Sequence, residues 1–222
     1  MIVRRKNRVV ALSIGILIVV GLCVQYSWFS GLFSEFSGLL EAHLRSAACL
    51  GNTRKVKRLV MLGVNVNATS DDGDSPLVAV EACKGDVATS RVELIELLIA
   101  HGAAVNLRNS EGRTALMYAA RNGDAPAVNA LLKSGASVNI ADNYGETAVM
   151  KAATSSCNEE TVRTLLSAGA DLNARDHKGR NALDSFHASY ACPESKVGSL
   201  LQEAVTGKTD DSSRSIQVNS SK

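Results

Sequence analysis

The side chains most able to do chemistry in this 222-residue chain are its five cysteines and four histidines. No histidine lies in an H-E-x-x-H pattern, no serine lies in a G-x-S-x-G pattern, and no Cys or His pair has the short spacing of a zinc site. The acidic run D-D-G-D at 71–74 could begin a calcium loop, but Ala82 rather than Glu occupies its twelfth position. The sequence therefore predicts no enzyme, no metal site and no cofactor.

Charge and hydropathy divide the chain into an amino-terminal segment and a body. The chain carries +2, and the four basic residues within 1–8 contribute +4, so residues 9–222 carry −2, which argues against a nucleic-acid-binding protein. Residues 9–24 have no charge and, with the aromatic residues up to Phe29, reach the length of about 20 residues that spans a bilayer. We expect a signal-anchor helix at 9–29, with residues 1–8 in the cytoplasm and the body exported, into the periplasm in a bacterium. The alternative is a cleaved signal and a soluble exported body.

The body contains a repeat that two separate markers define. The first marker reads G-V-N-V-N, G-A-A-V-N, G-A-S-V-N and G-A-D-L-N, beginning at residues 63, 102, 135 and 169. The second reads D-G-D-S-P-L, E-G-R-T-A-L, Y-G-E-T-A-V and K-G-R-N-A-L, with its glycines at 73, 112, 145 and 179. Both markers recur at intervals of 39, 33 and 34 residues. Such a period predicts a stack of units that bury their apolar faces against one another.

The repeat resembles the ankyrin repeat over about residues 40–203. The family's G-x-T-P-L-H-x-A-A core appears here as G-R-T-A-L-M-Y-A-A from Gly112 to Ala120. The family's His is absent from every unit and its Pro is present only at Pro76, which puts the stiffness of the turns in doubt. The resemblance implies an all-α ankyrin solenoid of stacked helix-turn-helix units with hairpin-like loops.

Apolar spacing places two helices in each unit, a short one and a longer one. Thr114 and Thr147 are expected to cap the short helices, and a glycine is expected in the left-handed region after each longer helix. We expect residues 30–40 to be a linker and the start of a capping helix, and residues 206–222 to be disordered. The predicted ankyrin domain covers 41–205, with units at about 41–70, 71–109, 110–142, 143–176 and 177–205.

Four cysteines lie in the body, an even number that suits disulfides in an exported domain. Cys157 and Cys192 fall in the expected inter-helix turns of adjacent units. Irregular turns can bring two cysteines close enough for a disulfide, so the sequence leaves both a bond and free thiols open there. Cys49 and Cys83 lie on more regular helix, where the spacing of stacked helices disfavours a bond. We therefore expect Cys49 and Cys83 to be free, buried thiols.

The resemblance implies that a protein partner binds along the variable loop tips and the adjoining short helices, on a concave face. The corresponding loop positions are Asp71, Asp72, Asp74, Ser110, Glu111, Arg113, Asn143, Tyr144, Glu146, His177, Lys178 and Arg180. The corresponding helix positions are Arg121, Asn122, Thr154 and Ser155. No small-molecule substrate is expected. Similar envelope ankyrin proteins include inhibitors of secreted toxins and accessory proteins of periplasmic enzymes. Two alternatives remain open: a thiol-based redox-protective protein, and a stack that only spaces something from the membrane.

Overall fold

The computed structural model describes residues 29–83, 88–189 and 196–206. Within these ranges the regular structure is helical, apart from one isolated antiparallel bridge between Ala141 and Thr147. The helices are α2 (Phe29–Cys49), α3 (Thr53–Met61), α4 (Pro76–Ala82), α5 (Ala88–Ala100), α6 (Ala115–Asn122), α7 (Ala125–Lys133), α8 (Ala148–Lys151), the π-helical η1 (Ala152–Ser156), α9 (Glu159–Ser167), α10 (Ala182–Ala188) and α11 (Val197–Thr206). The expected all-α fold is confirmed for these residues.

The chain divides into two compact units, residues 1–43 and 44–222. The described part of the first unit is the amino-terminal portion of α2, on which Phe36 and Leu39 are exposed. No helix within the described ranges has both the length and the apolar character that crossing a membrane requires. The predicted signal-anchor at 9–29 lies outside the described residues except for Phe29, so it stays a prediction.

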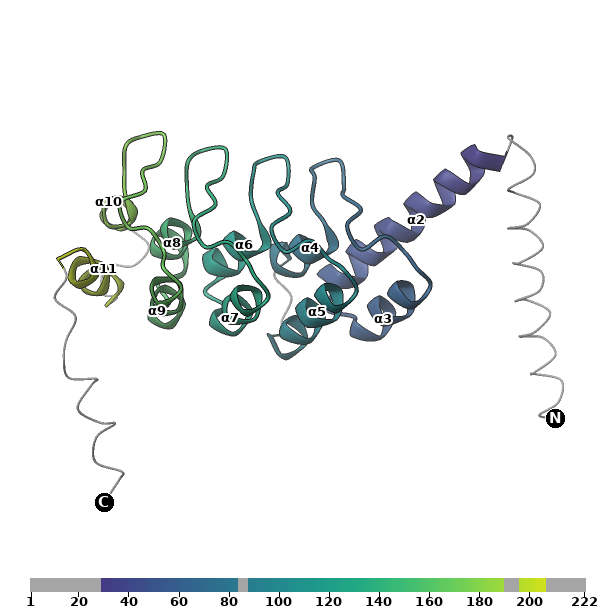
Figure 1. The fold of residues 1–222 in the computed structure, drawn as a ribbon, viewed down its shortest axis with the longest axis horizontal. Helices are drawn as coiled ribbons and strands as arrows, with labels where there is room; N and C mark the ends of the chain where they lie inside the picture. Colours follow the sequence, from purple (N-terminus) through teal and green to yellow (C-terminus); the bar gives the residue numbers. More distant parts are fainter. Residues whose placement is uncertain (1–28, 84–87, 190–195, 207–222) are drawn as a thin grey trace, which may run out of the picture. The chain divides into compact units, whose positions relative to one another are not determined.

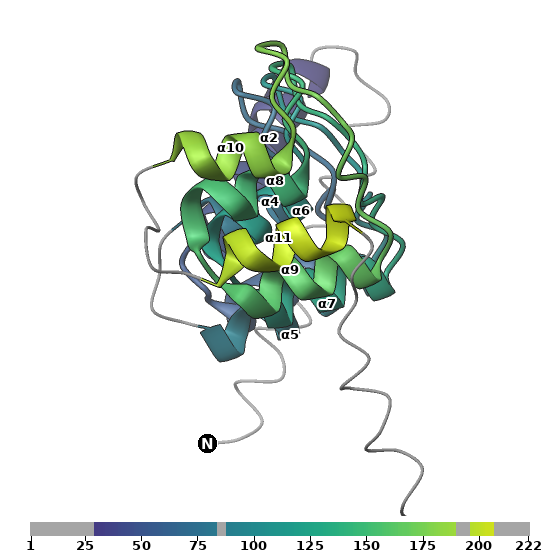
Figure 2. The same cartoon turned by 90° about the vertical axis from the view of Figure 1, so that its left-hand side faces the viewer.

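The second unit consists of two rows of helices and a row of loops (Figures 1 and 2). Helices α4, α6, α8 with η1, and α10 form the inner row, and α3, α5, α7, α9 and α11 form the outer row. The spacing i, i+3, i+4 of Leu116, Ala119 and Ala120 on α6 puts all three on the buried face of the helix. Small alanines allow neighbouring inner helices to approach closely, while leucines such as Leu131 fill the space between the rows.

The asparagine of the first three copies of the first marker connects its unit to the next one. Its side-chain amide donates to the carbonyl of the following marker's glycine, and its side-chain oxygen accepts from a backbone N–H two residues after that glycine. The three bridging side chains are Asn67, Asn106 and Asn139, and their hydrogen bonds measure 2.8–3.1 Å. The marker is therefore a structural connection between repeats.

Two local expectations have different outcomes. Gly102 and Gly135 have φ of +89° and +88° after their outer helices, so the left-handed glycine position is confirmed. Thr114 and Thr147 stand at the N-cap positions directly before α6 and α8, but neither hydroxyl accepts a hydrogen bond from its helix. The equivalent side chains of α4 and α10 do cap their helices: Ser75 accepts from Val78 N–H at 3.3 Å, and Asn181 accepts from Asp184 N–H at 2.8 Å. The expectation of threonine caps is therefore wrong for both helices, although both residues have the extended backbone angles of an N-cap.

Candidate functional site

Four loops project from the helical rows and stand side by side in Figure 1. They span residues 70–74, 109–113, 142–146 and 176–180, and together they are called the finger row here. Each loop is closed by a hydrogen bond from the N–H of its first residue to the carbonyl of its fifth, at 2.9–3.0 Å. This closure gives every loop the same shape, although their sequences differ.

A polar side chain at the first position of each loop clamps the loop from inside. Asn109 Oδ1 accepts from the N–H groups of Glu111 and Arg113, and Asp142 and Asp176 accept the corresponding pairs in their own loops, all at 2.9–3.1 Å. Ser70 Oγ accepts from Asp74 N–H in the first loop. These clamps close the turns although the family's histidine is missing, and the predicted loss of stiffness stays a prediction.

Backbone hydrogen bonds join neighbouring loops into a continuous row. The N–H of Ser110 donates to Asp72 O at 3.0 Å, that of Asn143 to Glu111 O at 2.9 Å, and that of His177 to Tyr144 O at 2.9 Å. The loops also lie so close that a β-carbon on Gly73 would stand 2.7 Å from the Ser110 nitrogen. The finger row is therefore formed before any partner arrives, which lowers the entropy cost of binding.

A chain of charged side chains runs beneath the loops of the third, fourth and fifth units. Lys151 Nζ lies 2.8 Å from Asp142 Oδ2 and also pairs with Glu146, while Arg113 Nε lies 3.6 Å from the same Asp142 oxygen. Arg180 binds Asp176 Oδ2 through two nitrogens, at 2.6 and 2.8 Å, and reaches Glu146 at 3.9 Å. This series of ion pairs links α8 to three loops and fixes the positions of the loops relative to one another.

The same contacts set the protonation of the two buried clamp carboxylates. Burial alone would raise the pKa of Asp142, but Lys151 and the N–H groups of Glu146 and Tyr144 hold it below the ordinary value. Burial likewise opposes ionisation of Asp176, and Arg180 with the backbone N–H groups of its loop holds the Asp176 pKa below the ordinary value. Both clamps therefore act as carboxylates at neutral pH.

The predicted partner-binding residues fall into two groups. Six are engaged inside the row by hydrogen bonds or ion pairs: Asp74, Glu111, Arg113, Asn143, Glu146 and Arg180. The other six are exposed, and their side chains form no hydrogen bond or ion pair within the described residues: Asp71, Asp72, Arg121, Tyr144, His177 and Lys178. The structure thus brings the predicted loop residues into one row, and only the second group is free to meet another molecule.

The adjoining helix positions divide in the same way. Asn122 donates to the Glu81 carbonyl at 2.7 Å, and Thr154 Oγ1 donates to the Met150 carbonyl at 3.0 Å, so both side chains serve the stack. Ser155 is exposed. Of these positions, Arg121 and Ser155 are available at the surface.

Tyr144 is the exposed aromatic side chain of the finger row. Its side chain is 54% exposed, and the Arg113 guanidinium carbon lies 5.9 Å from its ring centroid. Arg113 is itself held by Glu111 and Asp142, so the arginine supports one side of the ring in a fixed position. Tyrosine and arginine are among the residue types enriched at the hot spots of protein interfaces.

Sequence reasoning missed the clamp residues Asn109, Asp142 and Asp176, and also Lys151. The three clamps each lie three residues before the glycine of the second marker, so alignment of the repeats on Gly112, Gly145 and Gly179 could have found them. Lys151 had no such signal, because the equivalent residues are Tyr118 and Ala79.

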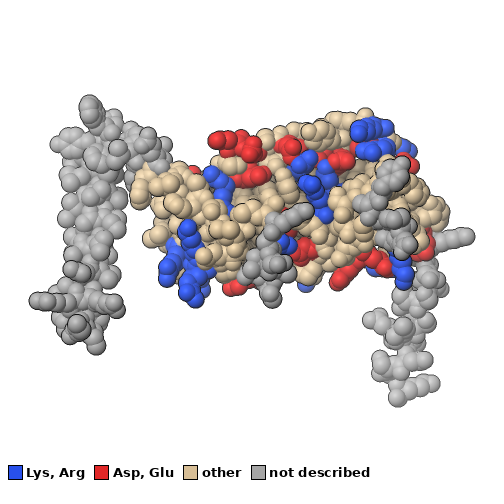
Figure 3. Space-filling view, turned by 180° about the vertical axis from the view of Figure 1, so that it is seen from behind, with Lys and Arg blue, Asp and Glu red and all other residues tan. Residues whose placement is uncertain are grey.

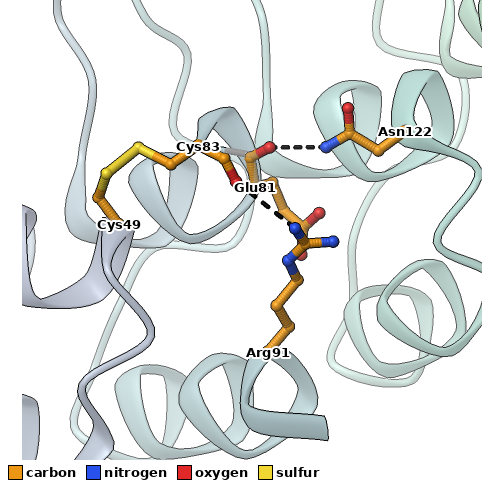
Figure 4. Close-up of a disulfide and its surroundings, with 5 residues drawn as sticks. All are labelled: Cys49, Glu81, Cys83, Arg91 and Asn122. Atoms are coloured by element: carbon orange, nitrogen blue, oxygen red, sulfur yellow. Dashed lines mark hydrogen bonds between the residues drawn. A yellow bond between two sulfur atoms is a disulfide. The ribbon is translucent and has the colours of Figure 1, made fainter. Parts of the chain in front are cut away.

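The cysteines depart from expectation. Cys49 and Cys83 form a disulfide, with 5.3 Å between their Cα atoms (Figure 4), so the prediction of free thiols there is wrong. The reason is local: Cys49 ends α2, and Cys83 leaves α4 with extended backbone angles, so neither is confined to helix spacing. Cys157 is also disulfide-bonded, but Cys192 lies outside the described residues, and their pairing stays a prediction.

A buried carboxyl lies two residues before Cys83. The side chain of Glu81 is fully buried, and neither of its oxygens has a hydrogen-bond partner among the described residues. Burial is the main cause that raises the pKa of Glu81 to about 7, and Asp124 adds to it, while Arg91 and Asn122 oppose it. Figure 4 shows Arg91 and Asn122 reaching the carbonyls of Cys83 and Glu81, at 3.5 and 2.7 Å.

Comparison with known families identifies the fold independently of this geometry. A family model described as ankyrin repeats (3 copies) matches residues 44–142 and 82–176, which together make up more than half of the chain. No group of three or more His, Cys, Asp or Glu residues in the described ranges is placed to hold a metal ion. Ankyrin repeats are protein-interaction modules and are typically non-enzymatic. The paired helices, the closed loops and this match together establish that the chain belongs to the ankyrin-repeat family.

Proposed function

We propose that this chain is a non-enzymatic protein-binding module, held at a membrane with its repeat domain exported, that grips a protein partner along the finger row. The observation that carries the proposal is Tyr144, which is 54% exposed on a loop that is clamped from within and supported by Arg113. Its ring offers a partner apolar area at low entropy cost, because the surrounding loop is already ordered.

The exposed charges of the row indicate how such a partner would be oriented. Asp71 and Asp72 make one end of the finger row acidic, and His177 and Lys178 lie at the other end. Because the inner charges are paired with one another, these terminal charges dominate the field that an approaching protein meets. A partner with the opposite charge gradient, and an apolar pocket for Tyr144 between its two charged regions, would fit best.

Photo-crosslinking in the native membrane tests this proposal. A benzophenone amino acid is placed at Tyr144, and the captured protein is identified by mass spectrometry. The same group at Arg163, an exposed residue of outer helix α9, is the control. We expect one dominant adduct from the Tyr144 position and none of the same identity from the Arg163 position.

Affinity measurements with the captured protein complete the test. We expect Tyr144→Ala to weaken binding at least about tenfold, as for a central interface aromatic. Asp72→Ala and Lys178→Ala should mainly slow association and reduce its dependence on salt. An unchanged affinity in Tyr144→Ala, or in Tyr144→Ala combined with Arg113→Ala, would favour a stack that serves only as a spacer.

The membrane tether and the export are separate parts of the proposal, and the uncharged run at residues 9–24 supports them. Protease added outside spheroplasts should cleave an exported body, and alkaline extraction should leave the chain in the membrane fraction. Release by alkali with a shortened amino terminus would favour the cleaved signal instead. The partner is proposed to be either a secreted toxin that the domain inhibits or a periplasmic enzyme that it assists, and the crosslinked protein distinguishes these.

The thiol-based redox alternative is less well supported. The Cys49–Cys83 pair is already bridged, and Cys157 is also in a disulfide. Thiol titration of the native chain addresses this alternative directly. Reactive thiols in the repeat domain, cycling with a physiological dithiol, would revive it.

A further inference from the structure

The outer helix of the first repeat, α3, exposes a basic face. Val56, Leu59 and Val60 are buried against the stack, at the spacing i, i+3, i+4. The rest of the helix surface carries four exposed cations within five residues, defined here as the basic face: Arg54, Lys55, Lys57 and Arg58. Figure 3 shows a cluster of Lys and Arg side chains at the end of the stack that carries α3.

The basic face gathers four cations in a stretch, residues 50–62, that contains no acidic residue. Elsewhere in the described chain, Arg91, Lys151 and Arg180 each lie within 4 Å of a carboxylate. None of the four side chains of the basic face forms an ion pair within the described residues. Residues 50–62 therefore carry +4, while the rest of residues 9–222 carries −6. The positive charge is concentrated on one helix of an otherwise acidic body.

Large apolar side chains stand exposed on the same surface. Leu50 is 70% exposed, Met61 75% and Leu62 74%. Met61 lies on the exposed side of α3 with the cations, and Leu62 directly follows the helix. A surface hollow lined by Leu50, Arg54, Lys55 and Arg58 lies at the beginning of the helix. Cations and apolar groups thus share one continuous surface around α3.

We propose that this surface docks on a bilayer that contains anionic phospholipids. Phosphate headgroups would neutralise the basic face, while Leu50, Met61 and Leu62 would enter the boundary between headgroups and acyl chains. Nucleic acid would satisfy the cations but would leave the three apolar side chains in water. The sequence also favours a lipid surface, because α3 belongs to the repeat that follows the apolar residues 9–24 most closely. The finger row, which is formed by other residues, stays available for a protein partner.

A fluorescence experiment on the full-length chain tests the docking. Met61→Trp, combined with Trp28→Phe, leaves one tryptophan as a reporter on the proposed surface. The chain is reconstituted with vesicles of phosphatidylcholine that carry brominated acyl chains, with or without phosphatidylglycerol. We expect quenching of Trp fluorescence only when phosphatidylglycerol is present, and we expect high salt to reverse it.

Charge-matched variants identify the residues responsible. One variant changes all four residues of the basic face, Arg54, Lys55, Lys57 and Arg58, to Gln. Over the phosphatidylglycerol titration, its quenching should be at least about tenfold weaker than that of the chain with the basic face. The control changes four other exposed cations to Gln, Arg121, Lys133, Lys178 and Lys196, and should keep the quenching. Circular dichroism melting checks that both variants remain folded, as expected for surface changes.

Three results would overturn the lipid proposal. Equal quenching in vesicles without phosphatidylglycerol would show that charge has no part in it. Unchanged quenching in the variant without the basic face would place the contact elsewhere. Anisotropy-detected binding of a labelled oligonucleotide that requires the four cations, without any quenching by vesicles, would assign the surface to nucleic acid instead.

Discussion

The second and third repeats place very different side chains at the same point of the inner helix. Glu81 on α4 corresponds to Ala120 on α6 and to Ala153 of η1, at intervals of 39 and 33 residues, and all three are fully buried. The alanines let the neighbouring helices approach closely. At Glu81 the packing instead buries a carboxyl group that has no hydrogen-bond partner among the described residues. This carboxyl group lies beside Arg91 of α5 and Asp124 at the start of α7.

The second repeat therefore contains a destabilising feature, the buried acid, and close to it a stabilising one, the disulfide. A pKa of about 7 for Glu81, against an ordinary 4.5, corresponds to about 3 kcal/mol of destabilisation at high pH. The Cys49–Cys83 disulfide, two residues further along, closes a separation of 34 residues and is worth about 3 to 4 kcal/mol on chain-entropy grounds. The two terms are of similar size and opposite sign, so we infer that the disulfide offsets the buried acid.

The largest effect is expected when the acid of the second repeat is copied into the third. Ala120→Glu would bury a carboxylate where neighbouring helices are packed on an alanine, and we expect a loss of about 5 kcal/mol in the free energy of unfolding. Urea denaturation measures this loss. Ala104→Glu, at an exposed loop position, is the control and should change stability by less than about 0.5 kcal/mol. A small loss in Ala120→Glu would mean that the stack accepts an acid at any repeat.

Removal of the disulfide should have the next largest effect. Cys49→Ser with Cys83→Ser should lower the free energy of unfolding by about 3 to 4 kcal/mol, because the unfolded chain regains its freedom. The substitution is preferable to a reductant, since Cys157 is also in a disulfide. Cys23→Ser is the control. Stability equal to that of the unchanged protein would show that the bond does not reinforce the first two repeats.

Replacement of the buried acid should raise stability in a pH-dependent way. Glu81 has a higher pKa in the folded state than in the unfolded state, so its contribution is favourable below about pH 4.5 and is lost as the pH rises to about 7. Glu81→Met should therefore raise the free energy of unfolding by about 2 to 3 kcal/mol at pH 8, and by less at pH 5. Urea denaturation at both pH values measures the difference. A gain that is equal at the two values would contradict the assignment.

The inferred offset between the two features has its own test. Adding Glu81→Met to the double-serine variant should restore most of the stability that the loss of the disulfide removes, when both are measured at pH 8. If Glu81→Met gains much less in the double-serine variant than in the unchanged protein, the two effects are coupled and do not simply offset each other.

The smallest effect is expected in the finger row, where a buried acid does have partners. Asp142→Asn keeps an oxygen for the loop clamp but removes the charge that faces Lys151, and should cost about 1 to 2 kcal/mol at pH 7. Because the Asp142 pKa is lowered by folding, its contribution is present above the ordinary value of 3.8 and is lost as the pH falls through the folded pKa. Acid denaturation followed by circular dichroism should begin at a higher pH in the native chain than in the variant, once their stabilities at pH 7 are matched with urea.

Sequence reasoning was most successful where one repeat could be compared with another. The two glycine markers predicted the repeating units and the left-handed turns, and the family match confirms the ankyrin assignment. The same reasoning failed for Thr114 and Thr147, because a residue type suited to a helix cap does not reveal what its hydroxyl will meet. It also could not show that Arg180 and Glu146, two of the predicted partner contacts, form ion pairs with other residues.

The repeat period, the apolar helix faces and the glycine positions could be predicted from the sequence, because each depends on contacts that recur in neighbouring repeats. Only the tertiary packing decided the Cys49–Cys83 bond, the division of the loop side chains into engaged and exposed ones, and the burial of Glu81 without a hydrogen-bond partner among the described residues. These features depend on single distances between residues more than 30 positions apart. A rule based on the typical spacing of stacked helices does not predict such individual distances.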